Sequence, residues 1–130
     1  MADRYQNYVN GKWSDGSSGA VSTSTNPADL SDVICEFQAS TSADAGAAID
    51  AAHNVKESWR RTSSLARGGY LIKAASYLEA NLEEFAQMVT RECGKAILEA
   101  RGEIGRAVAL LQYYGGEGSN PVGSVVPSVN

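Results

Sequence analysis

The sequence is poor in the residues that most often carry catalysis or covalent cross-links. It contains one histidine, His53, and two cysteines, Cys35 and Cys93, among 130 residues. Two cysteines are too few for the disulfide framework that holds many small secreted domains together, and their spacing matches no metal-binding motif. We therefore expect two free thiols and no thiol-based metal centre.

The chain also lacks an excess of basic charge and any long apolar run. Lys and Arg together number 11 against 15 Asp and Glu, which gives a net charge of -4. Nucleic acids and anionic membranes favour a basic surface, and a helix that spans a bilayer needs about 20 apolar residues. The first residues, Met1-Ala2-Asp3-Arg4, do not resemble a signal peptide. We therefore expect one cytoplasmic domain with no nucleic-acid or membrane partner.

The first part of the chain has the patterns of β-strands. Asn10-Gly11 lies at the centre of residues 8–13 and favours the type I′ turn of a tight hairpin. Residues 20–25 and 33–39 read as two further strands. Asn26-Pro27-Ala28 between them predicts a turn, because a residue that precedes proline avoids the helical region.

From residue 41 the apolar spacing changes to the helical period and predicts about four helices. Ser42 suits the N-cap of the first helix. Asn81 is expected to cap the third helix, with Glu84 in the reciprocal capping-box position. Met88 belongs to the predicted buried face of that helix, and Gly94 is placed to end it in a left-handed conformation.

Glycines shape the prediction for the fourth helix. We expect it over residues 97–114, with Gly115-Gly116 as its stop. Gly102 and Gly105 lie inside it and cost about 1 kcal/mol each relative to alanine, so we expect a close backbone neighbour. The predicted organisation is β-hairpin and strands in residues 1–40, helices in residues 41–118, and a linker in residues 119–130.

Few side chains in this pattern suit chemistry. His53 lies on a predicted helix face, where a surface role is far more common than that of a catalytic base. Cys93 falls near a helix C-terminus, whose negative end opposes thiolate formation. The glycines of residues 115–118 follow a helix rather than a strand, so they do not form a dinucleotide-binding loop. None of these residues by itself therefore indicates a catalytic group.

Taken in order, several segments are similar to the start of the aldehyde dehydrogenase family. Each segment is short, and the resemblance depends on their order and spacing over nearly the whole chain. Ala96 and Gln112 depart from a proline and an arginine that are common in the family. The similar segments are Tyr8-Val9-Asn10-Gly11-Lys12-Trp13, Asn26-Pro27-Ala28, Arg91-Glu92-Cys93-Gly94-Lys95, Tyr113-Tyr114-Gly115-Gly116 and Val125-Val126-Pro127-Ser128.

The resemblance implies an α/β fold, α+β within this chain, that is part of a cofactor-binding domain. Enzymes of the family oxidise an aldehyde through a thiohemiacetal, pass hydride to NAD or NADP, and hydrolyse a thioester. Their catalytic cysteine, glutamate base and cofactor-binding strands come later in the sequence. We therefore expect this chain alone to be inactive and to bind no cofactor, with residues 119–130 leading toward a bridging strand and Rossmann core. The complete enzyme is expected to be a homodimer or homotetramer that acts on a small aldehyde.

Four residues acquire expected roles from the resemblance. The carbonyl of Thr25 and the carboxylate of Glu92 match positions that bind a monovalent cation in several family members, and hard cations suit such oxygen ligands. Arg106 and Glu103 match positions that face the substrate entrance. An arginine there pairs readily with a second carboxylate on the substrate, which favours a carboxylated semialdehyde.

A second interpretation is a free-standing α+β interaction module without catalysis. Such a module needs its own sealed core and polar outer faces. The fourth predicted helix is apolar on more than one face and ends in Tyr113-Tyr114. A helix of that kind requires more packing partners than this chain offers, which argues against the module.

Overall fold

The computed structural model describes residues 3–120, 123 and 128. In this part of the chain, five short strands precede four helices, which confirms the predicted order. Most of the predicted linker, with Val125-Val126-Pro127, lies outside the described residues. The elements are β1 (Asp3–Tyr5), β2 (Asn7–Val9), β3 (Lys12–Ser14), β4 (Val21–Asn26), β5 (Asp29–Gln38), α1 (Ser42–Arg61), α2 (Ser64–Ala80), α3 (Leu82–Cys93) and α4 (Ile97–Glu117).

The strands form two small sheets. β2 and β3 pair as the predicted hairpin, and Asn10 and Gly11 have the positive φ angles, 51° and 76°, that its turn requires. The second sheet has the order β1-β5-β4, with β1 parallel and β4 antiparallel to β5. β5 begins at Asp29, earlier than expected, because it starts directly after the short turn at Pro27 and Ala28.

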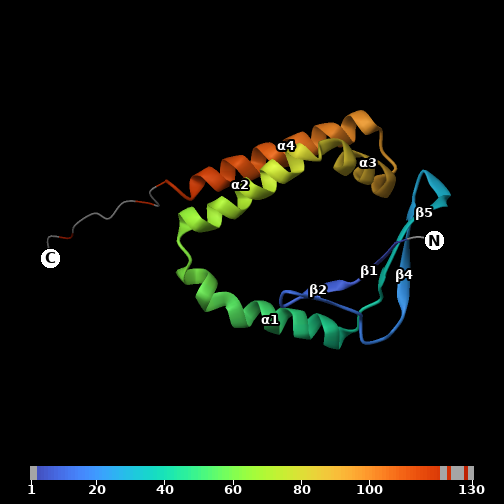
Figure 1. Ribbon diagram of the computed structural model, residues 1–130, viewed down its shortest axis with the longest axis horizontal. Coiled ribbons are helices and arrows are strands. Elements are labelled where there is room, and N and C mark those ends of the chain that lie inside the picture. Colours follow the sequence, from blue (N-terminus) through green and yellow to red (C-terminus); the bar gives the residue numbers. More distant parts are fainter. Residues whose placement is uncertain (1–2, 121–122, 124–127, 129–130) are drawn as a thin grey trace.

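The helices α2, α3 and α4 form one layer. In Figure 1, α2 and α4 run side by side along most of their length, and α3 lies at one end of them. Ala86, Ala100 and Ile104 form the buried centre between α3 and α4, with Leu82, Phe85, Val89 and Ile97 packed around it. Met88 was expected in this face but is 41% exposed, so that prediction is wrong.

The prediction for the glycines of α4 is also wrong. Gly115 and Gly116 lie within α4, which continues to Glu117. A Cβ on Gly68 would overlap the carbonyl oxygen of Gly115, so α2 and α4 touch backbone to backbone there. Around Gly102 and Gly105, by contrast, nothing in the described chain comes within 4 Å of a built Cβ. The close approach therefore belongs to Gly68 and Gly115.

The caps of two helices differ from the prediction. Thr41, not Ser42, is the N-cap of α1, and Asp44 completes a capping box with it. Asn81 precedes α3 as expected but makes no side-chain cap; its amide donates instead to the Tyr77 carbonyl oxygen at 2.8 Å. No capping box with Glu84 forms, because the Asn81 side chain satisfies the end of α2.

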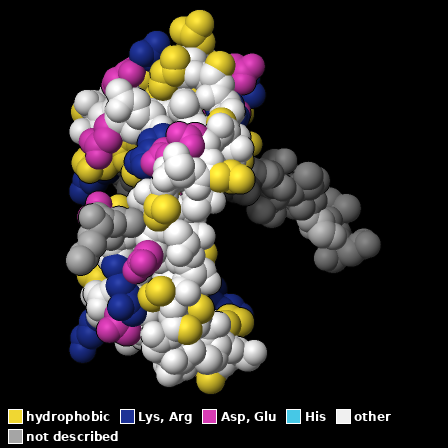
Figure 2. Space-filling model, turned by 90° about the vertical axis from the view of Figure 1, so that its right-hand side faces the viewer, with side chains coloured by type: hydrophobic (Ala, Val, Ile, Leu, Met, Phe, Trp, Pro, Cys, Tyr) yellow, Lys and Arg dark blue, Asp and Glu magenta, His cyan; other side chains and the backbone are white. Residues whose placement is uncertain are grey.

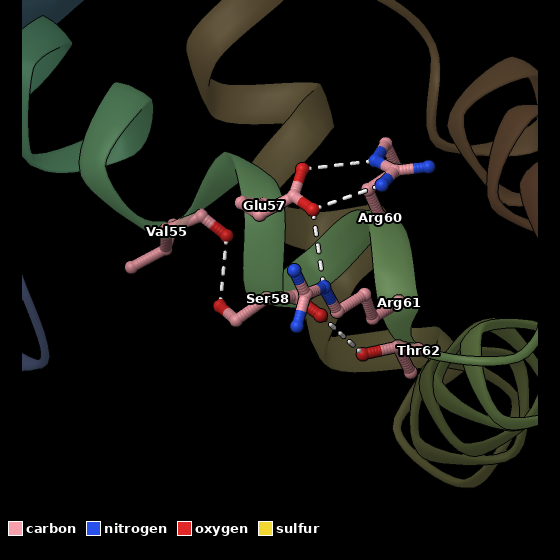
Figure 3. A network of polar contacts seen from close by, with 6 residues as sticks. All are labelled: Val55, Glu57, Ser58, Arg60, Arg61 and Thr62. Carbon is pink, nitrogen blue, oxygen red and sulfur yellow. Dashed lines mark hydrogen bonds and ion pairs between the residues drawn. The ribbon is translucent and has the colours of Figure 1, made fainter.

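Helix α1 has no buried residue, although its apolar side chains recur at helical spacing. Ile49 is 69% exposed, and hydrophobic side chains also reach the surface elsewhere (Figure 2). The last turns of α1 carry a polar network, in which both Arg60 and Arg61 donate to Glu57 (Figure 3). Among the described residues, no helix combines the length and apolar character needed to cross a membrane.

Candidate functional site

A bidentate ion pair joins the β4–β5 hairpin to α3. The guanidinium of Arg91 donates to the carboxylate of Asp32 through Nη2 at 2.6 Å and Nε at 3.0 Å. The Asn26 amide donates to the same carboxylate at 3.3 Å. Hydrogen bonds from Arg91 and then Asn26 lower the pKa of Asp32. The hairpin is thus held against the helix by a fork-shaped charged contact.

The end of α3 lies against the turn between the two strands. Gly94 ends the helix with a φ of 66°, as the sequence predicted. A Cβ at Gly94 would come within 2.9 Å of the Pro27 side chain and 3.2 Å of the Ala28 backbone nitrogen. Gly94 therefore serves two purposes, because it adopts the left-handed conformation and leaves room for the turn.

The two expected cation ligands lie on different elements, Thr25 on β4 and Glu92 on α3. Thr25 lies two residues before Pro27, and the regular pairing of β4 with β5 is interrupted on both sides of Thr25. Glu92 is exposed in the last turn of α3, beside Arg91. A pocket of about 390 Å³ lies between β1, β5 and α3, and Tyr5, Cys35 and Glu92 are among its lining residues.

The two residues expected at the substrate entrance have different surroundings. Glu103 forms an ion pair with Lys95, whose Nζ donates a hydrogen bond to Oε1 of Glu103 at 2.5 Å. Arg106 is exposed, and none of the ion pairs within residues 3–120 involves it. Lys95 belongs to the segment of residues 91–95 that resembles the family, but no role was predicted for it from the sequence. Its place directly after the helix-ending Gly94 is the signal that could have drawn attention to it.

The remaining candidate residues do not form a cluster in the described part of the chain. His53 and Cys93 are exposed, and Cys35 is half-buried. Within the described residues, no group of three or more His, Cys, Asp or Glu side chains could hold a metal ion. The capping site at the start of α1 is already taken by Asp44, and Gly115 and Gly116 lie at the C-terminal end of α4. The start of α1 is therefore not a free anion site, and the glycines at the end of α4 do not form a loop that opens a helix.

Comparison with known proteins gives consistent matches. The model of the aldehyde dehydrogenase family matches residues 13–130. The alpha-ketoglutaric semialdehyde dehydrogenase of Bacillus subtilis is 43% identical over 97% of this chain and 26% of its own length. The alpha-ketoglutarate semialdehyde dehydrogenase of Haloferax volcanii is 37% identical over all of this chain and 28% of its own. The chain thus spans about a quarter of these relatives.

The fold is shared with a solved structure as well. The NAD-dependent aldehyde dehydrogenase of Sinorhizobium meliloti superposes with a TM-score of 0.84 at 32% identity, over 90% of this chain and 24% of that protein. The segments quoted from the sequence, from the hairpin to the helix that contains Tyr113-Tyr114, occur here in one mixed α/β arrangement. On the extent of the family match and these identities, the chain belongs to the aldehyde dehydrogenase family as an N-terminal segment.

Proposed function

We propose that this chain is part of an enzyme that oxidises a carboxylated semialdehyde to the dicarboxylic acid with NAD or NADP. The observation that carries the proposal is the 43% identity, over nearly the whole chain, to a protein named for alpha-ketoglutaric semialdehyde. In this proposal the chain's part is to support and shape the site. The nucleophile, base and cofactor pocket belong to the remainder of the enzyme, so the chain alone is inactive.

The exposed apolar side chains support the proposal that this chain packs against the remainder of the enzyme. In the described part of the chain, the buried hydrophobic residues are only Ala75, Ala86, Ala100, Ile104 and Val108, and no large side chain is fully buried. A free-standing interaction module would bury large apolar side chains in a core of its own. The alternative of a non-catalytic module therefore has less support than a segment that packs against further protein.

Arg106 is our candidate for recognising the second carboxylate of the substrate. Its guanidinium is exposed and takes part in no ion pair within residues 3–120. A guanidinium fork matches a carboxylate in two parallel hydrogen bonds, and such charged contacts contribute about 1.5–3 kcal/mol.

The test is a comparison of two aldehydes in the complete enzyme. We expect Arg106→Ala to raise KM for succinic semialdehyde at least about tenfold, which corresponds to about 1.4 kcal/mol, while KM for the neutral pentanal stays the same. Arg106→Lys should give an intermediate value, because it keeps the charge and loses the fork. An unchanged KM for succinic semialdehyde in Arg106→Ala would remove the proposed role.

We also propose that the Thr25 carbonyl and the Glu92 carboxylate contribute to a monovalent-cation site. The support is geometric. The turn at Pro27 and Ala28 packs on Gly94, and Arg91, which precedes Glu92, is paired with Asp32 of β5. One carboxylate and a carbonyl are ligands that a hard cation accepts, and further ligands would come from the rest of the enzyme.

A further inference from the structure

The acidic side chain nearest to Arg106 along α4 is held by a lysine from outside that helix. Lys95 lies between α3 and α4, and its ammonium group binds Glu103 at 2.5 Å. The Lys95 side chain is the more enclosed partner, with 24% exposed against 51% for Glu103. The hydrogen bond to Glu103 raises the pKa of Lys95. The Lys95 ammonium and the Glu103 carboxylate therefore offset each other's charge.

Glu103 has another possible partner in Arg106. The two residues are three positions apart on α4, a spacing that makes side chains neighbours on a helix surface. If Lys95 did not hold it, the Glu103 carboxylate would compete with a substrate carboxylate for the Arg106 guanidinium. It would also repel that substrate, since like charges at short range are unfavourable.

We propose that Lys95 is a positioning residue for substrate selection, which holds Glu103 so that Arg106 stays available to the carboxylate of a semialdehyde. Glu103 then faces Lys95 rather than the substrate, which gives it a different role from the one that the family resemblance implies. This inference rests on the proposed function, in which Arg106 binds the carboxylate.

The test uses the complete enzyme with succinic semialdehyde and pentanal. We expect Lys95→Met to raise KM for succinic semialdehyde about two- to fivefold, the effect of one exposed charge pair. KM for pentanal and both kcat values should not change. The double variant Lys95→Met with Glu103→Gln should restore the wild-type KM, because the competing carboxylate is gone. Lys95→Arg keeps the ion pair and should behave like the wild type.

Arg101→Met is the matched control. Arg101 lies on α4 and pairs with Glu83 of α3 at 2.8 Å, so its loss likewise removes one cation and one ion pair that involves α4. Both KM values should stay unchanged in this variant. Equal KM increases for both aldehydes in Lys95→Met, or no recovery in the double variant, would overturn the inference. If the wild type does not distinguish the two aldehydes and Arg106→Ala changes nothing, the proposed function itself fails.

Discussion

At the scale of single residues, Asp44 shows how a carboxylate is used for structure rather than chemistry. It accepts hydrogen bonds from the Thr41 backbone N–H at 2.8 Å and from the Ser17 hydroxyl at 2.9 Å. These donors, the Thr41 backbone first, lower its pKa from 3.8 to about 2. Asp44 thereby ties the start of α1 to the loop after β3 and leaves that helix end with no free anion site.

The lowered pKa predicts a specific pH dependence. Between the pKa of Asp44 in the folded state and its pKa in the unfolded state, the folded state binds fewer protons. The contribution of Asp44 to the free energy of unfolding is therefore complete above the unfolded-state pKa and is lost as pH falls through the folded-state pKa. We predict that the difference in unfolding free energy between wild type and Asp44→Asn shrinks as pH is lowered from about 5 to about 2. Urea unfolding followed by circular dichroism measures this difference. If the difference in unfolding free energy were equal at about pH 5 and about pH 2, the lowered pKa of Asp44 would be contradicted.

Gly68 gives a second residue-scale prediction. Its hydrogen faces the Gly115 backbone, and a methyl group there would overlap the Gly115 carbonyl oxygen. Gly68→Ala should therefore destabilise the protein by about 1–3 kcal/mol, because two helix backbones must separate. Gly69→Ala is the control, since nothing lies within 4 Å of its built Cβ and alanine favours the helix by up to about 1 kcal/mol. In thermal denaturation, the melting temperature of Gly68→Ala should lie below that of the wild type, and that of Gly69→Ala should equal or exceed it.

At the scale of secondary-structure elements, local patterns were predictable and long-range contacts were not. The Asn10-Gly11 hairpin and the end of α3 at Gly94 depend on positive φ angles, which the residue types themselves indicate. The close packing of α2 on α4 depends on the contact between Gly68 and Gly115, and no local pattern carries that information. The Asp32–Arg91 pair likewise joins residues 59 positions apart.

The contact between the β4–β5 turn and α3 carries the element-scale prediction. If Thr25 and Glu92 help to bind a monovalent cation, potassium or sodium should stabilise the complete enzyme relative to choline at equal ionic strength. At a cation concentration ten times the dissociation constant, the free energy of unfolding rises by about 1.4 kcal/mol, which is measured as a higher melting temperature. Glu92→Gln should abolish the gain, whereas Glu84→Gln, exposed at the other end of α3, should keep it. A gain that persists in Glu92→Gln would exclude this carboxylate as a ligand.

At the scale of the whole molecule, the order of strands and helices could be predicted, but the way they cover one another could not. Apolar periodicity predicted α1 without showing that its apolar side chains, Ile49 and Trp59 among them, remain exposed here. Periodicity reports which residues share a helix face, and burial depends on what packs against that face. The site residues were predicted only through the family resemblance, since neither Arg106 nor Glu92 belongs to a catalytic motif of its own.

Our central proposal is that this chain is part of an aldehyde-oxidising enzyme whose chemistry is performed by residues outside it. The most direct test follows the absorbance of reduced cofactor with NAD+ or NADP+ and a carboxylated semialdehyde, for the complete enzyme and for the 130-residue chain alone. We predict turnover by the complete enzyme and none by the chain. Turnover by the chain alone would contradict the proposal, and the loss of that turnover in Cys93→Ser would identify Cys93 as a nucleophile, contrary to our expectation.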